Sequence, residues 1–286
     1  MTPASKLRSL IGSGKIVMAP GAMDSLSARL VERAGFPAVY MTGLGATASR
    51  LGQPDIGLLS QTEMTEHARN MARTVSIPII ADADTGYGGL SNIHRTVREY
   101  VQAGVAAIHL EDQVAPKRCG QLAGIKLIDA EEAANRLRCA VEARASDDLL
   151  VIGRTDAMPA IGAEEAIRRA RLYREAGVDL VFVDGIKTIR EVEAVAKHVA
   201  GPKVVSIVDG NETVKLTARD LEGMGFQVVL YAVTALFAAM KAVETALGHL
   251  KSAGTPADGP PTATYAELCE IVGLSLHQQM EERFGR

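Results

Sequence analysis

The stretch PIIADADTGYGG (residues 78–89) decides the fold, because a short apolar run ends abruptly in acidic residues and glycines. Runs of this kind recur along the chain and alternate with longer segments whose apolar residues have helical spacing. The eight runs are KIVMAP (15–20), PAVYMTG (37–43), PIIADADTG (78–86), AAIHLED (106–112), LLVIGRTDA (149–157), LVFVDG (180–185), KVVSIVDG (203–210) and QVVLYAV (227–233). Nearly continuous apolar character is typical of strands buried on both faces of a parallel sheet. Eight such units predict an α/β fold, a closed (β/α)8 barrel of TIM type. The alternative is an open doubly wound sheet, but no G-x-G-x-x-G follows the first run.

The chain length agrees with one barrel and a short extension. Of its 286 residues, a barrel domain is expected over 1–254, since one barrel takes about 250 residues. The Gly/Pro-rich stretch 255–263 cannot continue a helix and predicts a linker. Beyond it, residues 264–285 have helical spacing at Leu268, Ile271, Leu274 and Met280. This C-terminal helix either folds back on its own barrel or forms an arm exchanged with a neighbouring subunit.

Composition excludes several classes of partner. The net charge of −3 provides no positive field for nucleic acid or acidic lipid, so neither a nucleic-acid nor a membrane partner is expected. No apolar run approaches the roughly 20 residues of a membrane span, and the N-terminus lacks a signal-peptide core, which favours a cytoplasmic enzyme. Three scattered cysteines are too few for a disulfide framework or paired-cysteine zinc spacing.

Acidic residues gather where the third and fourth runs end. Asp82 and Asp84 are two apart and are expected on the same side of a strand, and Glu111 and Asp112 end the next run. Such residues meet at the C-terminal mouth of a barrel. Because crowded carboxylates repel one another unless a cation lies among them, and oxygen ligands favour Mg2+ or Mn2+, the cluster predicts a metal site. The alternative is that some of these acids cap the following helices.

Other polar residues at strand ends are candidate substrate ligands. Arg154 has a planar fork suited to a carboxylate, although it would also pair with Asp156 or Asp112. The backbone of residues 42–45 (TGLG) can approach an anion closely because glycine has no Cβ. Further residues near strand ends, any of which could be a turn former, are Asp55, Asp184, Ser206, Asp209 and Tyr231.

The loop after the fourth run, residues 113–129, is long for a βα connection and is expected to act as a lid. It contains Lys117, Arg118 and Cys119 in sequence. A thiol beside two cations is expected to have a lowered pKa and to serve as a nucleophile or proton donor. The alternative is an inert, small apolar side chain.

These residues together resemble a known family. The segments MTGLGATASRLGQPDIG (41–57), ADADTGYGG (81–89), HLEDQVAPKRCGQLAGIKL (109–127) and GRTDA (153–157) are similar to the isocitrate lyase and phosphoenolpyruvate mutase superfamily. The EDQ-x-x-x-KRCG loop resembles methylisocitrate lyase, 2,3-dimethylmalate lyase and carboxyphosphonoenolpyruvate mutase. The resemblance implies Mg2+ dependence and a homotetramer that exchanges its C-terminal helix.

The resemblance also implies roles for individual residues. Asp84 would bind the metal directly, and Asp82 and Glu111 would hold metal-bound waters. A 2-oxo or 2-hydroxy carboxylate substrate would lie among Thr42, Gly43, Leu44, Asp82, Gly120, Gln121, Arg154, Asp184, Ser206, Asp209 and Tyr231. Asp55 would lie near the reacting oxygen, Arg154 would clamp the substrate, and Cys119 would protonate the departing carbanion while the loop excludes water.

The chain departs from the family pattern at the substrate. Gln121 replaces a histidine of the lyase loop, Asp184 replaces a glutamate, and Ser206 and Asp209 stand where Asn-x-x-Glu is usual. The expected activity is a carbon–carbon lyase that cleaves a 2-hydroxy di- or tricarboxylate to pyruvate or glyoxylate plus a carboxylic acid. The alternatives are an oxaloacetate decarboxylase or 2-oxo acid hydrolase, a phosphonate mutase, and a non-catalytic metabolite-binding protein.

Overall fold

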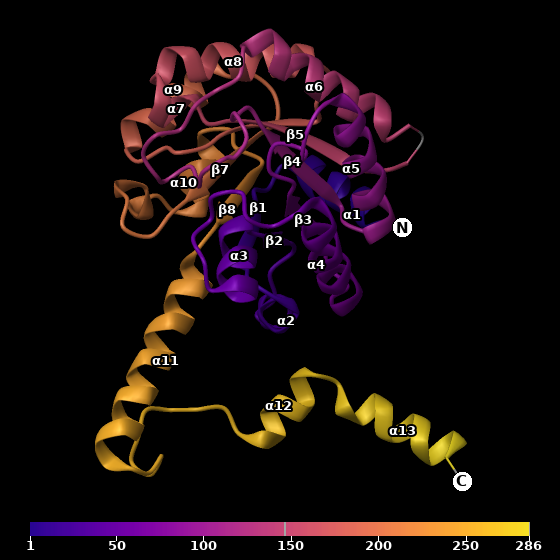
Figure 1. The fold of residues 1–286 in the computed structure, drawn as a ribbon, viewed down its shortest axis with the longest axis vertical. Coiled ribbons are helices and arrows are strands. Elements are labelled where there is room, and N and C mark those ends of the chain that lie inside the picture. The colour runs from indigo at the N-terminus through magenta and orange to yellow at the C-terminus, as the bar shows by residue number, and fades with distance from the viewer. Residues whose placement is uncertain (146, 286) are drawn as a thin grey trace. The chain divides into compact units, whose positions relative to one another are not determined.

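A computed structural model describes residues 1–145 and 147–285, and its described strands close into one parallel barrel. Neighbours along the chain pair in order, and β1 pairs with β8 to close the ring (Figure 1). The strands are β1 (Val17–Ala22), β2 (Val39–Met41), β3 (Ile79–Asp82), β4 (Ala107–Glu111), β5 (Leu150–Thr155), β6 (Leu180–Val183), β7 (Lys203–Ile207) and β8 (Val228–Tyr231). The predicted (β/α)8 fold is confirmed, as is the parallel pairing that continuous apolar runs indicate.

The first helix precedes β1, and its buried Ala4 and Leu7 pack with the side chains inside the barrel, whereas the helices that follow the strands cover its outside (Figure 1). In unit order they are α1 (Pro3–Gly12), α2 (Ser25–Arg33), α3 (Gly43–Leu51), α4 (Gln61–Thr74), α5 (Leu90–Ala103), α6 (Ala130–Ala143), α7 (Ala157–Ala160), α8 (Ala163–Glu175), α9 (Ile189–His198), the 3-10 turn η1 (Glu212–Lys215) and α10 (Ala218–Gly223). Capping residues set several helix starts, as at Asp24 before α2 and Ser60 before α4. Gly104 adopts φ +83° and ends α5, as its place after the helical pattern predicts.

Strand alternation separates two cores. Side chains such as Ile80, Ile152 and Phe182 fill the inside of the barrel, whereas their neighbours in sequence pack under the helices. Apart from His109, the inner layer is largely apolar up to this level. One step of two residues further along β2 to β7, the inward positions become polar, so this layer forms the floor of the site described below.

The chain divides into two compact units, Met1–Thr234 and Ala235–Arg286. The boundary between them lies after Thr234, the first residue of α11 (Thr234–Ala253), so most of this helix belongs to the second unit. The physical reason is that Leu236 is the one residue of α11 that is buried, whereas apolar side chains such as Phe237 and Met240 are exposed.

The second unit contains two C-terminal helices instead of the single one expected. They are α12 (Tyr265–Ile271) and α13 (Leu274–Phe284). Gly273 lies between them with φ +74°, a conformation that interrupts a helix and that glycine adopts without strain. Among the described helices, none is both long enough and apolar enough to cross a membrane.

Candidate active site

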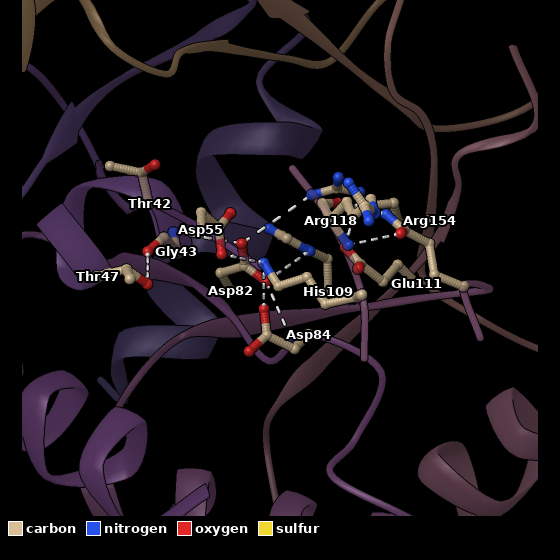
Figure 2. A network of polar contacts seen from close by, with 12 residues as sticks. Thr42, Gly43, Thr47, Asp55, Asp82, Asp84, His109, Glu111, Arg118 and Arg154 are labelled. Atoms are coloured by element: carbon tan, nitrogen blue, oxygen red, sulfur yellow. Dashed lines mark hydrogen bonds and ion pairs between the residues drawn. The ribbon is translucent and has the colours of Figure 1, made fainter. Parts of the chain in front are cut away.

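The C-terminal mouth of the barrel is ringed by polar side chains that continue the inward rows. Asp82 follows Ile80, Arg154 follows Ile152, and Asp184 lies two residues after Phe182. Glu111 and Ser206 occupy the corresponding positions of β4 and β7. All but Asp184 are buried. Period-two alternation therefore brings together acids and a guanidinium that are far apart in sequence (Figure 2).

Asp84 reaches the same mouth by a turn rather than by strand alternation. β3 ends at Asp82, and Asp84 has φ +46°, which few residues other than glycine adopt. The turn is held on both sides, since the Asp84 N–H donates to Asp82 Oδ1 over 2.9 Å and the Glu111 N–H donates to the Asp84 carbonyl over 2.9 Å. The expectation that Asp82 and Asp84 share one face of a strand is wrong. They nevertheless lie close together (Figure 2).

Lys117 joins this cluster, although the sequence singled it out only as a neighbour of the lid cysteine. Its buried ammonium lies 2.7 Å from Asp55 Oδ1 and 2.7 Å from Asp84 Oδ1. Both ion pairs are shielded from solvent, so they are stronger than surface pairs of the same length. The only sequence signal for this role was the place of Lys117 on the lid, because the direction of a loop side chain has no periodic pattern.

Arg154 is the second internal cation of the mouth. It donates to both carboxylate oxygens of Asp156, over 3.0 and 2.8 Å, and its Nη2 lies 2.6 Å from Asp184 Oδ2. Its Nε is 3.3 Å from Glu111 Oε2, and its Nη1 has only a 4.0 Å contact with Asp82 Oδ2. The pairing with Asp156 that the sequence allowed is therefore present. Four acids orient one guanidinium, and Nη1 is the nitrogen least engaged by them.

The acids fit a divalent cation in their chemistry but are not assembled around one. Among residues 1–145 and 147–285, no three acidic, histidine or cysteine side chains converge with metal-ligand geometry. The crowding of Asp82, Asp84 and Glu111 is instead relieved by Lys117 and Arg154. Both carboxylate oxygens of Glu111 are nevertheless buried and accept no hydrogen bond in the described structure. A buried acid with free lone pairs is a favourable site for Mg2+ or a water bound to it.

Burial sets the charge of these acids. It raises the pKa of Asp84 to about 6 despite the opposing effect of Lys117, and it also raises the pKa of Glu111. At Asp82 burial acts in the same direction, but interaction with His109, followed by Lys117 and Arg154, lowers its pKa to about 2. Without further positive charge, the mouth therefore holds Asp82 firmly ionised and Asp84 near its titration point.

A buried pair lies beneath Asp82. His109 Nε2 is 3.1 Å from the Tyr40 hydroxyl. On the other side of the ring, His109 Nδ1 is 3.6 Å from Asp82 Oδ1 (Figure 2). Burial lowers the pKa of His109 to about 4, so the imidazole is neutral near pH 7. The His109 ring packs against Phe182, and it also supports the Asp82 carboxylate from below.

The N-terminus of α3 faces the acids. Thr42 caps the helix, and the Gly43 N–H donates to Asp82 Oδ2 over 3.3 Å. A Cβ at Gly43 would lie 2.5 Å from the same oxygen, so the close approach requires glycine. With Leu44, these residues bring backbone N–H groups of the first helical turn to the mouth, which favours an anion there.

A lid comprising residues 113–127 lies over the mouth. The Cys119 N–H donates to the Asp55 carbonyl over 3.0 Å, and the Gln113 side chain both donates to the Arg118 carbonyl and accepts from its N–H. A Cβ on Gly120 would lie 2.6 Å from Asp184 Oδ2 and 2.8 Å from Asp156 Oδ1. The lid backbone is therefore in close contact with the acids around Arg154, and glycine is required at that point.

Cys119 is not the activated thiolate that its cationic neighbours predict. Burial raises the pKa of its thiol to about 11, because Lys117 contacts Asp55 and Asp84 instead and Arg118 is exposed. The expected lowered pKa is wrong. A thiol with this pKa is protonated near pH 7, which suits a proton donor rather than a nucleophile.

The remaining candidates differ in their distance from this network. Gln121 Oε1 accepts a hydrogen bond from Asn211 Nδ2 over 3.2 Å, a contact with the β7 end that the sequence did not indicate. Tyr231 is half-buried at the end of β8. Asp209 is exposed, and its carboxylate accepts from the Thr234 hydroxyl over 2.6 Å. In this structure Asp209 is thus engaged away from the acids, because β7 ends at Ile207 and the chain turns outward.

Asp112 points away from the mouth and fixes Asp156 from behind. One of its oxygens accepts from Tyr173, Thr155 and Arg169 over 2.6, 2.7 and 3.1 Å, and the other accepts from the Asp156 N–H over 2.9 Å. The strand that presents Glu111 inward presents Asp112 outward. Asp112 therefore positions Asp156, the acid that is hydrogen-bonded to Arg154. It does not lie with Asp82, Asp84 and Glu111, the acids expected to form the metal site.

Comparison with known proteins identifies relatives across the chain. The family model described as phosphoenolpyruvate phosphomutase matches residues 7–251. The chain is 39% identical to 2,3-dimethylmalate lyase of Eubacterium barkeri, covering 100% of this chain and 99% of that protein. It is 37% identical to 2-methylisocitrate lyase of Aeropyrum pernix, covering 99% and 92%.

Solved structures with several activities have the same fold. Oxaloacetate acetylhydrolase in complex with 3,3-difluorooxalacetate superposes with a TM-score of 0.94 at 35% identity, covering 99% of this chain and 97% of that one. Phosphonopyruvate hydrolase in complex with oxalate and Mg2+ superposes with a TM-score of 0.90 at 33% identity, covering 100% of both chains.

Proposed function

The chain belongs to the phosphoenolpyruvate mutase and isocitrate lyase superfamily of enzymes, and from this premise we propose that it is a Mg2+-dependent carbon–carbon lyase. Its substrate is a 2-hydroxy di- or tricarboxylate similar to 2,3-dimethylmalate or 2-methylisocitrate. The products are a 2-oxo acid, pyruvate or glyoxylate, and a carboxylic acid. Identity over the full length to lyases that act on such substrates supports the proposal.

The observation that most favours carbon–carbon bond cleavage is the position and charge of Cys119. The lid holds this half-buried residue beside Asp55 through its backbone N–H, one residue before the glycine packed against Asp156 and Asp184. A carbanion that leaves a 2-oxo acid must be protonated, and a thiol with a pKa of about 11 retains its proton until such a strong base forms.

Two side chains of this protein carry out the two proton transfers of the reaction. Asp55 accepts the proton of the substrate 2-hydroxyl, and the C2–C3 bond breaks as the C2–O bond becomes a carbonyl. The electron pair of the broken bond passes to C3, where the adjacent carboxylate stabilises it until Cys119 donates its proton. Arg154 and the α3 N-terminus bind substrate carboxylates, and the closed lid excludes water that would otherwise compete as a proton donor.

Asp84 would hold Mg2+, with Asp82 and Glu111 binding its waters. The ion would supply positive charge that stabilises the developing 2-oxo acid. Oxygen-only ligands and the free lone pairs of buried Glu111 support this choice, and Mn2+ would suit the same donors.

A second candidate is hydrolysis of a 2-oxo dicarboxylate. The similarity to oxaloacetate acetylhydrolase supports it, as does Gln121, which cannot titrate where the lyases have histidine. In this reaction an activated water would add to the C2 carbonyl, and the C2–C3 bond of the hydrate would then break. The carbanion left at C3 would again need a proton, so Cys119 would have the same role in either reaction.

The exposed apolar side chains of α11–α13 support a homotetramer in which residues 255–286 pack on a neighbouring subunit. In the described chain, α12 and α13 have no buried residue, whereas Leu268, Leu274, Leu276 and Met280 are exposed. Exposed apolar area of this extent marks an interface.

The deciding experiment is a proton NMR assay with and without Mg2+ on 2-methylisocitrate, 2,3-dimethylmalate, isocitrate and oxaloacetate. Release of pyruvate or glyoxylate with an equimolar carboxylic acid supports the lyase. Acetate and oxalate from oxaloacetate would establish the hydrolase instead, and pyruvate from oxaloacetate above the metal-only rate would indicate a decarboxylase. Absence of turnover on all four substrates would contradict each of these activities.

A further inference from the structure

Lys117 is the one lid side chain among the described residues that forms ion pairs with the acids of the mouth. It lies 2.7 Å from Asp55 and 2.7 Å from Asp84, the residue assigned to Mg2+ in the proposed function. An ammonium on a flexible four-carbon stem is a compact, movable point charge. The lid therefore places its own cation on the acid that a metal would bind.

We propose that Lys117 is an internal counter-cation of the metal site, which neutralises Asp55 and Asp84 before the metal arrives and is displaced from Asp84 when a divalent cation binds. Metal binding is thereby coupled to the conformation of the lid. This inference rests on the proposed function, because it takes Asp84 as a metal ligand.

The charge balance of the mouth supports displacement. Asp55 and Asp84 are buried acids whose common described cationic partner is Lys117, so without a metal the ammonium prevents two carboxylates from facing each other unneutralised. A divalent ion at Asp84 would lie close to this ammonium, and because both side chains are buried the two like charges would repel strongly. Because Asp55 remains available, Lys117 can keep one partner after it leaves Asp84.

The connection to the lid is covalent and short. Lys117 is two residues from Cys119, whose N–H donates to the Asp55 carbonyl, and one residue from Arg118, whose backbone is held by Gln113. A shift of the Lys117 backbone therefore alters the segment that carries the thiol. A metal that bound Asp84 without displacing Lys117 would not shift the lid in this way.

A cleft open to solvent adjoins the pair while the lid is in place. It has a volume of about 580 Å³, and Asp84 and Lys117 form part of its wall. Its wall includes Ser60, Gln61, Thr62 and Thr85, whose hydroxyl and amide oxygens suit a hydrated cation. Exchange between Lys117 and the metal thus has a polar route from solvent.

The test compares Mg2+ binding, measured by calorimetry without substrate, in the wild type, Lys117→Met and Arg118→Met. Displacement predicts that K117M binds Mg2+ at least roughly tenfold more tightly, the size of a one-unit electrostatic shift from a charge within 4–6 Å. Arg118 is the matched control, since it is the adjacent cation of the same lid but is exposed. An equal gain in R118M would reveal a general charge effect and overturn the proposal.

A second measurement follows the lid directly. The chain has no tryptophan, so Leu122→Trp at an exposed lid position provides a single fluorescent reporter. Mg2+ is expected to change its emission with the midpoint found by calorimetry, and the change is expected to disappear when K117M is added. A metal response that survives K117M would refute the coupling. Lys117→Gln, which keeps a hydrogen-bond donor, replaces K117M if circular dichroism shows that K117M is unfolded.

The outcomes separate the two proposals. Mg2+ binding with unchanged affinity in K117M overturns displacement and leaves the metal-dependent lyase intact. Absence of Mg2+ binding in both the wild type and K117M overturns the metal assignment, and the inference with it. Binding in K117M but not in the wild type is the strongest result in favour of displacement.

Discussion

The barrel mouth and the helices α11–α13 differ in whether their side chains find partners within the same chain. The mouth buries charge and neutralises it within the same chain, through Lys117 and Arg154. The helices instead expose apolar side chains such as Phe237 and Leu276, which no described residue buries. A buried charge without a partner destabilises the folded chain itself. An exposed apolar face leaves the single chain folded and becomes buried only when a partner molecule binds. Function at the mouth is therefore expected to respond to single substitutions, and the helical unit to changes in assembly.

The largest expected effect comes from removing one acid of the mouth. Asp84→Asn should lower Mg2+-dependent turnover by about 1,000-fold or more, since a metal contributes several kcal/mol to catalysis and about 1.4 kcal/mol equals a factor of ten. Initial rates across a Mg2+ titration measure it. The control is Glu66→Gln, an exposed acid of α4, which should behave as the wild type. A D84N enzyme with an undiminished Mg2+ response would remove Asp84 from the metal site.

Cys119→Ser tests the lid. Turnover should fall by at least roughly 100-fold, the lower range for general acid catalysis, while the fold and Mg2+ affinity persist. Cys139 provides the matched control, because it lies on α6 and its thiol donates to the Leu90 carbonyl rather than facing the mouth. Turnover of C119S equal to that of Cys139→Ser would exclude the thiol as proton donor.

Asp112→Asn tests how far the charge balance extends behind the mouth. The free energy of unfolding should fall by about 2 kcal/mol, because a buried network loses its charge and one acceptor. Urea unfolding measures this loss. Glu165→Gln removes the more exposed partner of the same Arg169 and should cost less than about 1 kcal/mol. Equal losses in the two variants would show that burial does not distinguish these ion pairs.

Truncation tests the helical unit. Removing residues 262–286 should lower the molar mass in light scattering by about two- to fourfold, as expected if a symmetric assembly loses a reciprocal interface. Circular dichroism of the barrel should change little, since the removed residues contribute no buried side chain in the described chain. An unchanged mass would show that these helices do not hold the assembly together.

The sequence predicted the strands of the barrel more reliably than the backbone conformation of the segments that connect secondary-structure elements. Eight apolar runs and the glycine after α5 correspond to observed features because strand burial and helix termination are local. The prediction of one continuous C-terminal helix was wrong, because Gly273 interrupts it. The left-handed turn at Asp84 was also missed, since hydrogen bonds from outside the turn hold a conformation that aspartate rarely adopts.

The candidate site divides in the same way. That Asp82, Glu111 and Arg154 share one mouth follows from their places at strand ends, and the sequence predicted it. The ion-pair and hydrogen-bond partners of these side chains could not be predicted from the sequence. Lys117 was expected to lower the pKa of Cys119, yet it pairs with Asp55 and Asp84, and burial raises the pKa of the thiol instead.

By itself, the sequence determined the barrel, the acidic and cationic groups at its mouth, and membership in a superfamily through long motifs. Periodicity and residue chemistry are properties of short segments, so they can be recognised without coordinates. Only the tertiary structure decided that Lys117 lies on Asp84, that Asp112 points outward and that Cys119 keeps its proton. Those outcomes depend on burial and on distances between groups many residues apart, and neither quantity is defined until the chain has folded.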